Sequence, residues 1–277
     1  MARTWLITGV SAGLGRALAK AALDRGDTVA GTVRNDAAGA AFEALAPGRA
    51  HAVPMDVTDA AAVLCAVADV EARLGVIDVV VNNAGYGLVG AVEEASLEEV
   101  RAQFETNVFG PLAVLKAVLP GMRARRSGAV VNVTSVSGLA TWAGTGVYCA
   151  SKFALTALTQ TMAAELAELG VTVINVAPGG MRTDFAGRSQ HLVAEKLADY
   201  DGLARDAERI LADHAGHESG DPAKMAAAIL KAVDADKPPL NLLLGEDALK
   251  YAGYGRDALW ADVEAWRETT LSTAFED

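Results

Sequence analysis

Short apolar runs alternate with helical stretches along almost the whole chain of 277 residues, and this alternation restricts the possible folds more than any other feature. Apolar runs of about four to eight residues between longer helical stretches are typical of βαβ units, in which right-handed crossovers join parallel strands. Seven strands are expected, at Trp5–Thr8, Thr28–Thr32, Ala50–Pro54, Val76–Val81, Ala129–Val133, Val171–Val176 and Leu240–Leu244. The sequence therefore predicts an α/β fold with a doubly wound, seven-stranded parallel sheet and helices on both faces.

Helical periodicity fills the intervals between these strands. The expected helices are Leu14–Arg25, Ala37–Ala46, Ala60–Leu74, Leu97–Phe109, Pro111–Ala124, Tyr148–Leu169 and Pro222–Ala235. No linker, repeat or low-complexity tract divides the sequence, so we expect a single domain over residues 1–277, with its core in residues 1–183.

Between residues 184 and 221 the alternation stops, and the segment is polar and helical. It follows the sixth strand, on the carboxyl side of the sheet, where ligands bind in open α/β folds. We interpret it as a lid over a substrate, with a pair of surface helices as the alternative. Residues 222–277 supply the last helix, the last strand and an apolar tail. The sequence leaves open whether this tail covers the core, closes a cleft or joins a second subunit.

The charge balance excludes two classes of partner. The chain has 24 basic and 35 acidic residues and a net charge of −11. Binding to nucleic acid or to an anionic membrane needs a basic surface, so neither partner is expected. The N-terminus has no signal-peptide pattern and no apolar run approaches the ~20 residues of a membrane span, so we expect a cytoplasmic protein. The two cysteines make no disulfide framework, and no metal is expected, because His214 and His217 stand without a thiolate pattern.

Three glycines follow the first strand and open the first helix, where the chain reads TGVSAGLG. Glycine permits a tight turn and a close backbone approach to a pyrophosphate, and the helix N-terminus adds N–H donors and a positive dipole end. The spacing differs from the common G-x-G-x-x-G pattern, although the physics is the same. We therefore predict a dinucleotide site formed by Gly9, Ser11, Gly13, Leu14 and Gly15.

The residue after the second strand bears on which dinucleotide is bound. A site for NAD usually places an acidic residue there to hold the ribose 2′-hydroxyl, whereas this chain has Val33 and then Arg34. A guanidinium suits a 2′-phosphate, so we predict NADP(H) as the cofactor. The alternative is that Arg34 is solvated and Asp36 holds the ribose.

Two further strand ends supply expected cofactor contacts. Asp56 and Val57 end the third strand, and the Asp56 carboxylate can accept a hydrogen bond from the adenine amino group. The alternative for Asp56 is the N-cap of the next helix, for which Asp59 is the better candidate. The fourth strand ends with the sequence NNAG, whose small residues let the backbone pass close to the ribose, while its asparagines can tie neighbouring strands together. The expected contacts there are Asn82, Ala84 and Gly85.

Tyr148 and Lys152 lie four residues apart, so on a helix their side chains project from one face. A phenol ionises near pH ~10, and an ammonium beside it favours the phenolate and lowers its pKa. Ser135, thirteen positions before the tyrosine, can share a carbonyl oxygen with the phenol. Together these groups can move a proton on or off an alcohol oxygen. The Y-x-x-x-K spacing alone arises by chance on many helices, so the surrounding motifs carry the interpretation.

Asn107 has a physical argument of its own. In a helix its carbonyl would accept a hydrogen bond from the N–H of residue 111, but residue 111 is proline and has no N–H. The Asn107 carbonyl is therefore expected to be free to bind a water molecule. A kinked helix with no part in proton transfer is the alternative.

The full series of motifs resembles the short-chain dehydrogenase/reductase family. The family's order is followed over residues 3–183 by TGVSAGLG, DV, NNAG, Asn107, Ser135, YCASK and PGGMRT. The resemblance implies a single-domain Rossmann-like fold, a nicotinamide cofactor and hydride transfer between an alcohol and a carbonyl. It also implies a homodimer or homotetramer. Beyond Thr183 no family motif can be carried over.

The resemblance implies a role for individual residues. Tyr148 would be the general acid in reduction and the base in oxidation, while Lys152 would lower the Tyr148 pKa and hold the nicotinamide ribose hydroxyls. Ser135 would position and polarise the carbonyl. A water on the Asn107 carbonyl would join a proton relay that runs from Tyr148 through the ribose and Lys152 toward solvent. The nicotinamide end would be held by Pro178, Gly179, Met181 and Thr183.

We therefore expect an NADPH-dependent carbonyl reductase that also works as an alcohol dehydrogenase. The expected substrate contacts are Ser135, Ser137, Tyr86, Leu88, Trp142 and Tyr148. The lining is largely apolar, so the substrate would be an uncharged, hydrophobic ketone, aldehyde or secondary alcohol. The alternatives are an NAD-dependent alcohol or steroid dehydrogenase of the same family, a redox-silent dinucleotide-binding regulator, and an epimerase or dehydratase on the same fold.

Overall fold

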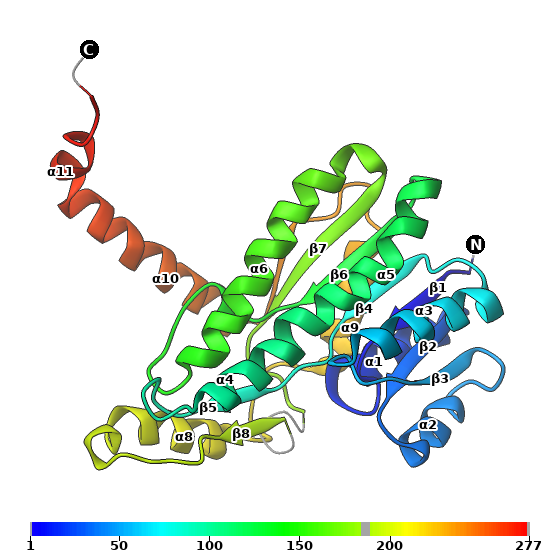
Figure 1. Cartoon of the computed structure of the whole chain (residues 1–277), viewed down its shortest axis with the longest axis horizontal. Helices are drawn as coiled ribbons and strands as arrows, with labels where there is room; N and C mark the ends of the chain where they lie inside the picture. Colours follow the sequence, from blue (N-terminus) through cyan, green and yellow to red (C-terminus); the bar gives the residue numbers. More distant parts are fainter. Residues whose placement is uncertain (1, 184–188, 276–277) are drawn as a thin grey trace.

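The seven expected strands form one parallel sheet. The computed structural model describes residues 2–183 and 189–275, and the order of the strands is β3-β2-β1-β4-β6-β7-β9 (Figure 1). These strands are β1 (Thr4–Ile7), β2 (Thr28–Val33), β3 (Ala50–Pro54), β4 (Val79–Asn82), β6 (Gly128–Val133), β7 (Val171–Pro178) and β9 (Asn241–Leu244). The chain changes direction across the sheet between β1 and β4, as in a doubly wound fold, so the predicted fold class is confirmed.

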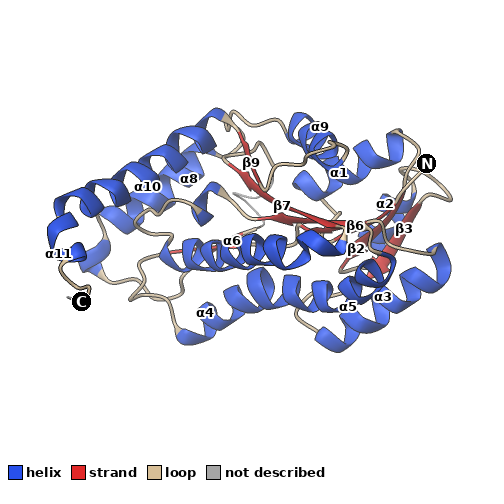
Figure 2. Ribbon diagram, turned by 90° about the horizontal axis from the view of Figure 1, so that it is seen from above, coloured by secondary structure: helices blue, strands red, loops and turns tan. Residues whose placement is uncertain are grey.

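Helices cover both faces of the sheet, as Figure 2 shows. The first layer contains α1 (Gly13–Asp24), α2 (Asp36–Glu43) and α9 (Pro222–Val233). The second layer contains α3 (Ala60–Leu74), α4 (Leu97–Phe104), α5 (Gly110–Arg125) and α6 (Gly146–Leu166). Successive strand residues point to opposite faces, so Trp5 and Ile7 pack under the first layer while Leu6 packs under the second. Each helix layer therefore has its own hydrophobic core.

The helix expected over Leu97–Phe109 is divided by a π-helical turn. α4 ends at Phe104, and the turn η1 (Glu105–Phe109) precedes α5. The N–H of Gly110 donates to the carbonyl of Glu105, and Pro111 has no N–H to continue the ordinary helical ladder. The sequence predicts a break at Pro111 but not its π form.

Several short elements were not expected. β5 (Gly87–Val89) pairs with β8 (Gln190–Leu192) in a second parallel sheet, too short for a hydrophobic period to be visible in the sequence. The 3₁₀ turns are η2 (Val136–Gly138), η3 (Ala167–Leu169) and η4 (Ala198–Tyr200). The ends of longer elements differ by a few residues from the prediction, since the strand expected from Val76 starts at Val79 and the helix expected from Tyr148 starts at Gly146.

The polar segment 189–221 is anchored to the connection between β5 and α4. The Glu94 carboxylate is buried and accepts hydrogen bonds from the N–H groups of Ala91 (2.8 Å) and Leu197 (2.7 Å). Arg205 of α8 (Leu203–His214) pairs with the same carboxylate. Charge pairing at a buried acceptor therefore docks this segment beside β5. Residues 184–188 of the expected lid lie outside the described residues, and its role as a lid stays a prediction.

The C-terminal helices leave the body of the molecule. α10 (Glu246–Ala265) starts after β9, packs against the loop at Ala140 and leads into α11 (Arg267–Leu271). Figure 1 shows this arm, in orange and red, projecting away from the sheet. Trp260 and Trp266 on it are 60% and 65% exposed. The distal half of the tail therefore does not cover the core of the sheet, which was one of the three roles that the sequence left open.

A row of asparagines marks the register of four neighbouring strands. From β4 through β6 and β7 to β9, the row consists of Asn82, Asn132, Asn175 and Asn241. The Asn82 amide donates to the Asn132 oxygen at 2.8 Å, and the Asn175 amide donates to the Asn241 oxygen at 2.9 Å. The Asn132 amide donates to the Thr159 hydroxyl on α6 at 2.9 Å. A slip of one residue would break these bonds, and each buried polar group left unpaired costs about 1–3 kcal/mol.

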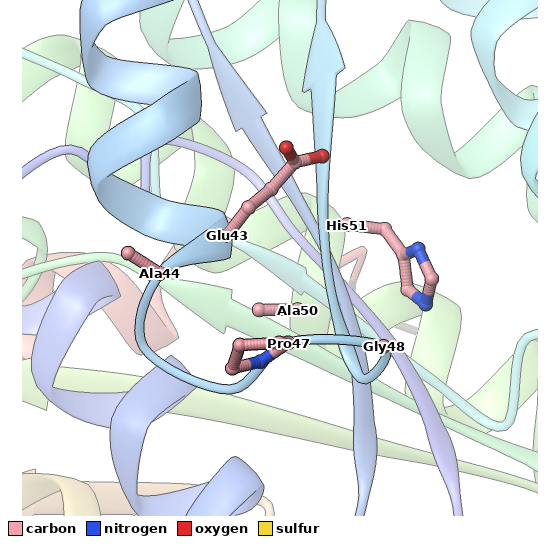
Figure 3. A pocket seen from close by; sticks show the side chains of 6 residues that line it. All are labelled: Glu43, Ala44, Pro47, Gly48, Ala50 and His51. Atoms are coloured by element: carbon pink, nitrogen blue, oxygen red, sulfur yellow. The ribbon is translucent and has the colours of Figure 1, made fainter.

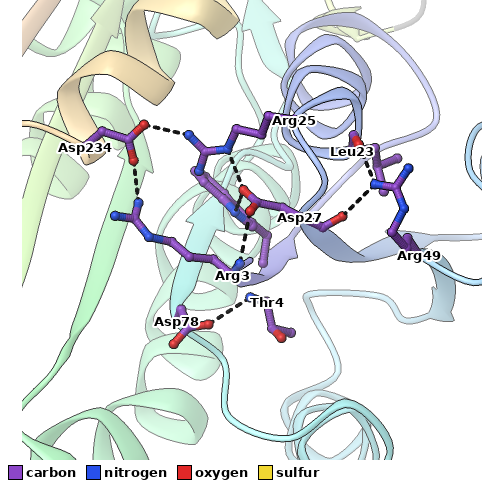
Figure 4. A network of polar contacts seen from close by, with 9 residues as sticks. Arg3, Thr4, Leu23, Arg25, Asp27, Arg49, Asp78 and Asp234 are labelled. Carbon is purple, nitrogen blue, oxygen red and sulfur yellow. Dashed lines mark hydrogen bonds and ion pairs between the residues drawn. The ribbon is translucent and has the colours of Figure 1, made fainter. Parts of the chain in front are cut away.

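The opposite, amino edge of the sheet is closed by a network around Asp27 (Figure 4). The Asp27 carboxylate, 5% exposed, accepts hydrogen bonds from the Trp5 indole (2.8 Å) and the Arg25 guanidinium (2.5 Å). The backbone N–H of Arg3 supplies a third hydrogen bond at 3.0 Å. The side chains of Arg3 and Arg25 also pair with Asp234, which follows α9. The network therefore ties β1 and the turn after α1 to the end of α9.

A shallow pocket lies near this amino edge (Figure 3). It is formed by the end of α2, the loop that follows and the start of β3. Its lining consists of Glu43, Ala44, Pro47, Gly48, Ala50 and His51. The Glu43 carboxylate accepts a hydrogen bond from the N–H of Ala52 at 3.1 Å, so it already has a partner within the fold. The pocket lies at the amino edge of the sheet, whereas the residues of the sequence motifs lie at the carboxyl edge, so the two are remote from each other.

Replacing Asp27 by alanine should lower the free energy of unfolding by about 2–3 kcal/mol, because three donors lose a buried charged acceptor. Urea denaturation followed by circular dichroism measures this change. Asp24→Ala is the matched control, since the exposed ion pair of Asp24 with Lys20 contributes at most about 0.5 kcal/mol. Equal losses of stability in the two variants would contradict the role given to the buried network.

Candidate active site

The glycine turn between β1 and α1 explains the spacing of its three glycines. Gly9 and Gly13 have φ angles of +73° and +59°, in the left-handed region that favours glycine. Position 15 requires glycine for a different reason, since a Cβ there would overlap the Asn83 side-chain amide and the Gly9 carbonyl. The N-cap residue of α1 is Ala12, which offers no side-chain acceptor to the leading N–H groups of the helix. The turn is therefore a close-fitting cradle with helix N–H donors beside it, as an anion requires.

The end of β4 is bonded directly to this turn through Thr8 and Asn83, which lie within the two motifs but were not among the expected site residues. The backbone N–H groups of Asn83 and Ala84 both donate to the Thr8 hydroxyl at 2.9 Å. The Asn83 side-chain amide donates to the carbonyls of Thr8 (2.9 Å) and Gly9 (3.1 Å). The Asn82 side chain lies instead within the asparagine row of the sheet. Because neighbouring residues of a strand point to opposite faces, the sequence could have predicted that Asn82 and Asn83 have different partners.

Arg34 is exposed immediately after β2, near Asp56. Hydrogen bonds from the N–H (2.9 Å) and the hydroxyl (2.8 Å) of Thr58 hold the pKa of Asp56 below its usual range, and the Arg34 charge lowers it further. Asp56 therefore forms a turn with Thr58, and the N-cap of α3 is Asp59, the better candidate in the sequence. Asp36 lies in the first turn of α2.

Three other expected cofactor residues differ in exposure. Ser11 is exposed at the glycine turn, where its side chain can meet a phosphate. Leu14 and Val57 are buried, Leu14 in the core of the first helix layer and Val57 in that of the second. Only the backbone of these two residues can therefore face a dinucleotide.

The loop after β7 returns to the glycine turn. Pro178 ends the strand, and Met181 forms an isolated bridge with Gly220. Thr183 lies against the turn, because a Cβ on Gly13 would be 3.7 Å from its side chain. The loop that was expected to hold the nicotinamide thus reaches the glycine turn at its far end.

Ser135, Tyr148 and Lys152 meet near the carboxyl end of β6. The Ser135 side chain is hydrogen-bonded to Tyr148, and its oxygen also accepts the N–H of Ser137 at 3.0 Å. Tyr148 and Lys152 lie on successive turns of α6, with the Lys152 Nζ 5.9 Å from the centroid of the Tyr148 ring. The Nζ donates to the carbonyl of Val133 at 3.0 Å. The structure therefore brings the three expected catalytic groups together.

Burial dominates the protonation of this pair. It raises the pKa of Tyr148 to about 12. The hydrogen bond with Ser135 lowers this pKa and the neighbouring Cys149 raises it, but both effects are smaller than that of burial. Burial also lowers the pKa of Lys152 to about 8. Lys152 is not among these influences, and its Nζ is bonded to the Val133 carbonyl, so the expectation that Lys152 lowers the Tyr148 pKa stays a prediction. At neutral pH the phenol is protonated and the lysine is charged.

Asn107 connects the NNAG segment to the helix of Tyr148. Its side chain accepts the N–H of Tyr86 (3.2 Å) and donates to the Tyr86 carbonyl (2.9 Å). The same amide donates to the Ser151 hydroxyl (3.1 Å), which donates to the Tyr148 carbonyl (2.7 Å). A Cβ on Gly85 would lie 3.0 Å from the Asn107 side-chain oxygen, so the glycine permits this approach. Ser151 was not foreseen, although it lies inside the YCASK motif.

Two aromatic contacts lie among the loops on the carboxyl side. Tyr86 packs on His191 of β8, with ring centroids 4.7 Å apart. Trp142 meets Tyr251 of α10 edge-on, with centroids 5.3 Å apart. Leu88 is buried in a separate small core and does not belong to either contact. Tyr86 and Trp142 were expected substrate contacts, whereas His191 and Tyr251 come from segments beyond the motif series and carry no motif of their own.

Comparison with known proteins identifies the family. The model of a family described as short chain dehydrogenase matches residues 3–192, and the chain belongs to the short-chain dehydrogenase/reductase family of oxidoreductases. Oxidoreductase BOA17 of Botryotinia fuckeliana is 38% identical over 275 residues, which cover 99% of this chain and 100% of that protein. The 3-ketodihydrosphingosine reductase of Bacteroides thetaiotaomicron is 34% identical over 242 residues, 87% of each chain. The crystal structure of a short-chain dehydrogenase from Streptomyces avermitilis is 41% identical, with a TM-score of 0.93 over 99% of this chain and 98% of that one.

Family membership confirms the predicted Rossmann-like fold, and members of this family use a nicotinamide cofactor. Solved structures of the same fold hold NADP in some cases and NAD in others, so the family alone leaves the choice of dinucleotide open. Among the described residues, no helix has the length and hydropathy needed to cross a membrane. Nor do residues 2–183 and 189–275 gather three or more His, Cys, Asp or Glu side chains as a metal site would require.

Gly15→Ala tests the contact between the glycine turn and β4. Alanine usually stabilises a helix position by about 1 kcal/mol relative to glycine, but here the added Cβ would overlap Asn83 and Gly9. We expect the free energy of unfolding, measured by urea denaturation, to fall by about 1–3 kcal/mol. In the control Gly253→Ala on α10, the described structure leaves open space around the Cβ, so stability should be unchanged or higher. A neutral Gly15→Ala would show that the close approach does not exist.

Proposed function

We propose that the protein is an NADPH-dependent carbonyl reductase that also works in reverse as an alcohol dehydrogenase. The observation that carries the proposal is the hydrogen bond between Ser135 and the protonated phenol of Tyr148, one helical turn from the charged Lys152. Two hydroxyl groups within hydrogen-bonding distance of each other can exchange that bond and both donate to one carbonyl oxygen, which orients the carbonyl and stabilises negative charge on its oxygen.

The residues of the carboxyl edge fit a nicotinamide dinucleotide. The cradle at Gly9 and Gly13 would hold the pyrophosphate with the N–H groups of α1, and Asp56 would meet the adenine. Lys152 would bind the nicotinamide ribose, and the loop Pro178–Thr183 would hold the nicotinamide end. The bound cofactor supplies the hydride.

Arg34 favours NADP(H) within this family. Its guanidinium is exposed at the end of β2, and it is close enough to Asp56 to lower the pKa of that carboxyl, so it lies at the proposed adenine end. A guanidinium can donate two parallel hydrogen bonds to a phosphate. Asp36, the alternative ribose contact, is the first residue of α2, two positions after Arg34.

Tyr148 would act as the general acid of reduction. Because its pKa is raised to about 12, the phenol holds its proton at neutral pH. As the carbonyl carbon receives the hydride, the phenol transfers this proton to the carbonyl oxygen, which yields an alcohol and a phenolate. The nearby Lys152 ammonium stabilises the phenolate as it forms. A relay through Lys152 and a water on the Asn107 carbonyl then restores the proton from solvent.

We propose an uncharged, hydrophobic ketone, aldehyde or secondary alcohol as the substrate. Tyr86 and Trp142 offer aromatic surface, and both are backed by rings from the segments after β7 and β9. The relative from Bacteroides thetaiotaomicron is named for the reduction of a keto compound, which agrees with this class. The segment 189–221, docked through Glu94 and Arg205, would cover the substrate as a lid.

A homodimer or homotetramer in the cytoplasm is proposed as the working form. Phe153 and Leu158 on α6 are 40% and 37% exposed, and the arm formed by α10 and α11 exposes two tryptophans. Apolar surface of this kind favours association with another subunit. Light scattering would measure the mass, and cell fractionation the location; a monomer at micromolar concentration would argue against the assembly.

Tyr148→Phe should lower kcat for carbonyl reduction by about 10²–10⁴, because it removes the proton donor and leaves the ring in place. The dissociation constant for NADPH should stay within about twofold of the parent value. The measurements are NADPH absorbance, with a panel of hydrophobic ketones and aldehydes, and a fluorescence titration. Tyr254→Phe, which removes a phenolic hydroxyl from the exposed face of α10, is the control and should be neutral. Undiminished turnover in Tyr148→Phe would disprove the mechanism. A parent that binds NADPH but reduces no carbonyl would favour the redox-silent regulator.

Arg34→Asp should raise the KM for NADPH about 10–100-fold, since a charged hydrogen-bonding partner of the 2′-phosphate is replaced by a like charge. The same change should lower the KM for NADH. Steady-state kinetics with both cofactors and one substrate measure the two effects. Asp36→Asn is the control and should leave the KM for NADPH within about twofold. If the parent uses NADH equally well, or if only Asp36→Asn changes the preference, the ribose is held by Asp36.

A further inference from the structure

The Asp247 carboxylate binds the loop that is proposed to hold the nicotinamide. Asp247 lies in the first turn of α10, directly after β9. Its Oδ2 accepts the backbone N–H of Gly180 at 2.6 Å, and its Oδ1 accepts the N–H of Ala248 at 2.9 Å. A carboxylate is also favourable at a helix N-terminus, where the dipole is positive. One side chain therefore joins the start of α10 to a loop 67 residues earlier in the chain.

The backbone around this carboxylate leaves no room for side chains. A Cβ on Gly179 would overlap both carboxylate oxygens, and a Cβ on Gly245 would lie 2.5 Å from Oδ1. Gly245 also has a φ of +110°, which favours glycine for conformational reasons. Gly179 has no positive φ, so the space occupied by Asp247 is the reason for glycine there.

The loop is held by neutral contacts on one side and by this charge on the other. Gly180 accepts a hydrogen bond from the N–H of Gly220 (3.1 Å), and Arg182 donates one to the Gly220 carbonyl (2.9 Å). Asp247 adds an ionised acceptor, and such hydrogen bonds are roughly twice as strong as neutral ones. Thr183, at the far end of the loop, lies against the glycine turn. A displacement at Gly180 would therefore change how the loop meets that turn.

We propose that Asp247 is a positioning residue that preorganises the loop Pro178–Thr183 for the nicotinamide end of the cofactor. The inference rests on the proposed function, which assigns the nicotinamide to this loop. A loop that is ordered before binding loses little conformational entropy on binding, so removal of its anchor weakens affinity. Asp247 lies outside the matched residues 3–192, so the anchor comes from the C-terminal helix and not from the motif series.

The test measures NADPH affinity by fluorescence titration for Asp247→Ala, Asp247→Asn and Glu246→Gln. Asp247→Ala should weaken binding about tenfold, because the charged acceptor of Gly180 is lost. Asp247→Asn keeps an acceptor without the charge and should fall between Asp247→Ala and the parent. Glu246→Gln removes the same charge from an exposed position in the same helical turn and should stay within about twofold.

Binding of 2′,5′-ADP, which carries the adenine end alone, separates positioning from a general loss of structure. Asp247→Ala should bind this fragment as the parent does, because the loop serves the other end of the cofactor. Unchanged NADPH affinity, or equal weakening of NADPH and the fragment, would overturn the proposal. If thermal unfolding shows that Asp247→Ala does not fold, Asp247→Asn decides by the same comparison. A parent that binds neither NADPH nor NADH would overturn the proposed function instead.

Discussion

The amides of Asn82, Asn132 and Asn175 are buried in register in the carboxyl halves of β4, β6 and β7, and the alignment of the functional edge depends on them. The NNAG segment, Ser135 and the proposed nicotinamide loop follow these strands within a few residues. A slip of one residue would move the following loop by about 3.3 Å and turn its side chains to the other face. Because it would also leave buried amides unpaired, the register that pairs them also assembles the site.

The two edges of the sheet use charge in opposite ways. At the amino edge, Asp27 is surrounded by donors that stabilise its charge. At the carboxyl edge, burial lowers the pKa of Lys152 from 10.5 to about 8, which amounts to about 3 kcal/mol against the charged form. Burial keeps the Tyr148 phenol protonated in the same place. The fold therefore holds an acid and a cation where neither is well hydrated, which strengthens the effect of the cation on the phenolate that the proposed reaction forms.

Segments beyond the motif series complete the carboxyl side. His191 of β8 backs Tyr86, and Tyr251 of α10 backs Trp142. Asp247, one helical turn before Tyr251, anchors the loop at Gly180. α10 therefore contacts both the loop proposed for the cofactor and the loop proposed for the substrate. This explains why a helix whose distal half leaves the body of the molecule is firmly attached at its start.

The sequence by itself determined the seven strands of the main sheet, the glycine turn and the group of Ser135, Tyr148 and Lys152, because each depends on local spacing or on backbone freedom. It also located the break before Pro111, since a missing N–H is a property of the residue. Only the tertiary structure decided the different roles of Asn82 and Asn83, the raised pKa of Tyr148 and the contacts of His191 and Asp247. Burial and hydrogen bonding between segments distant in the chain produce these properties, and no local pattern records which segments will meet.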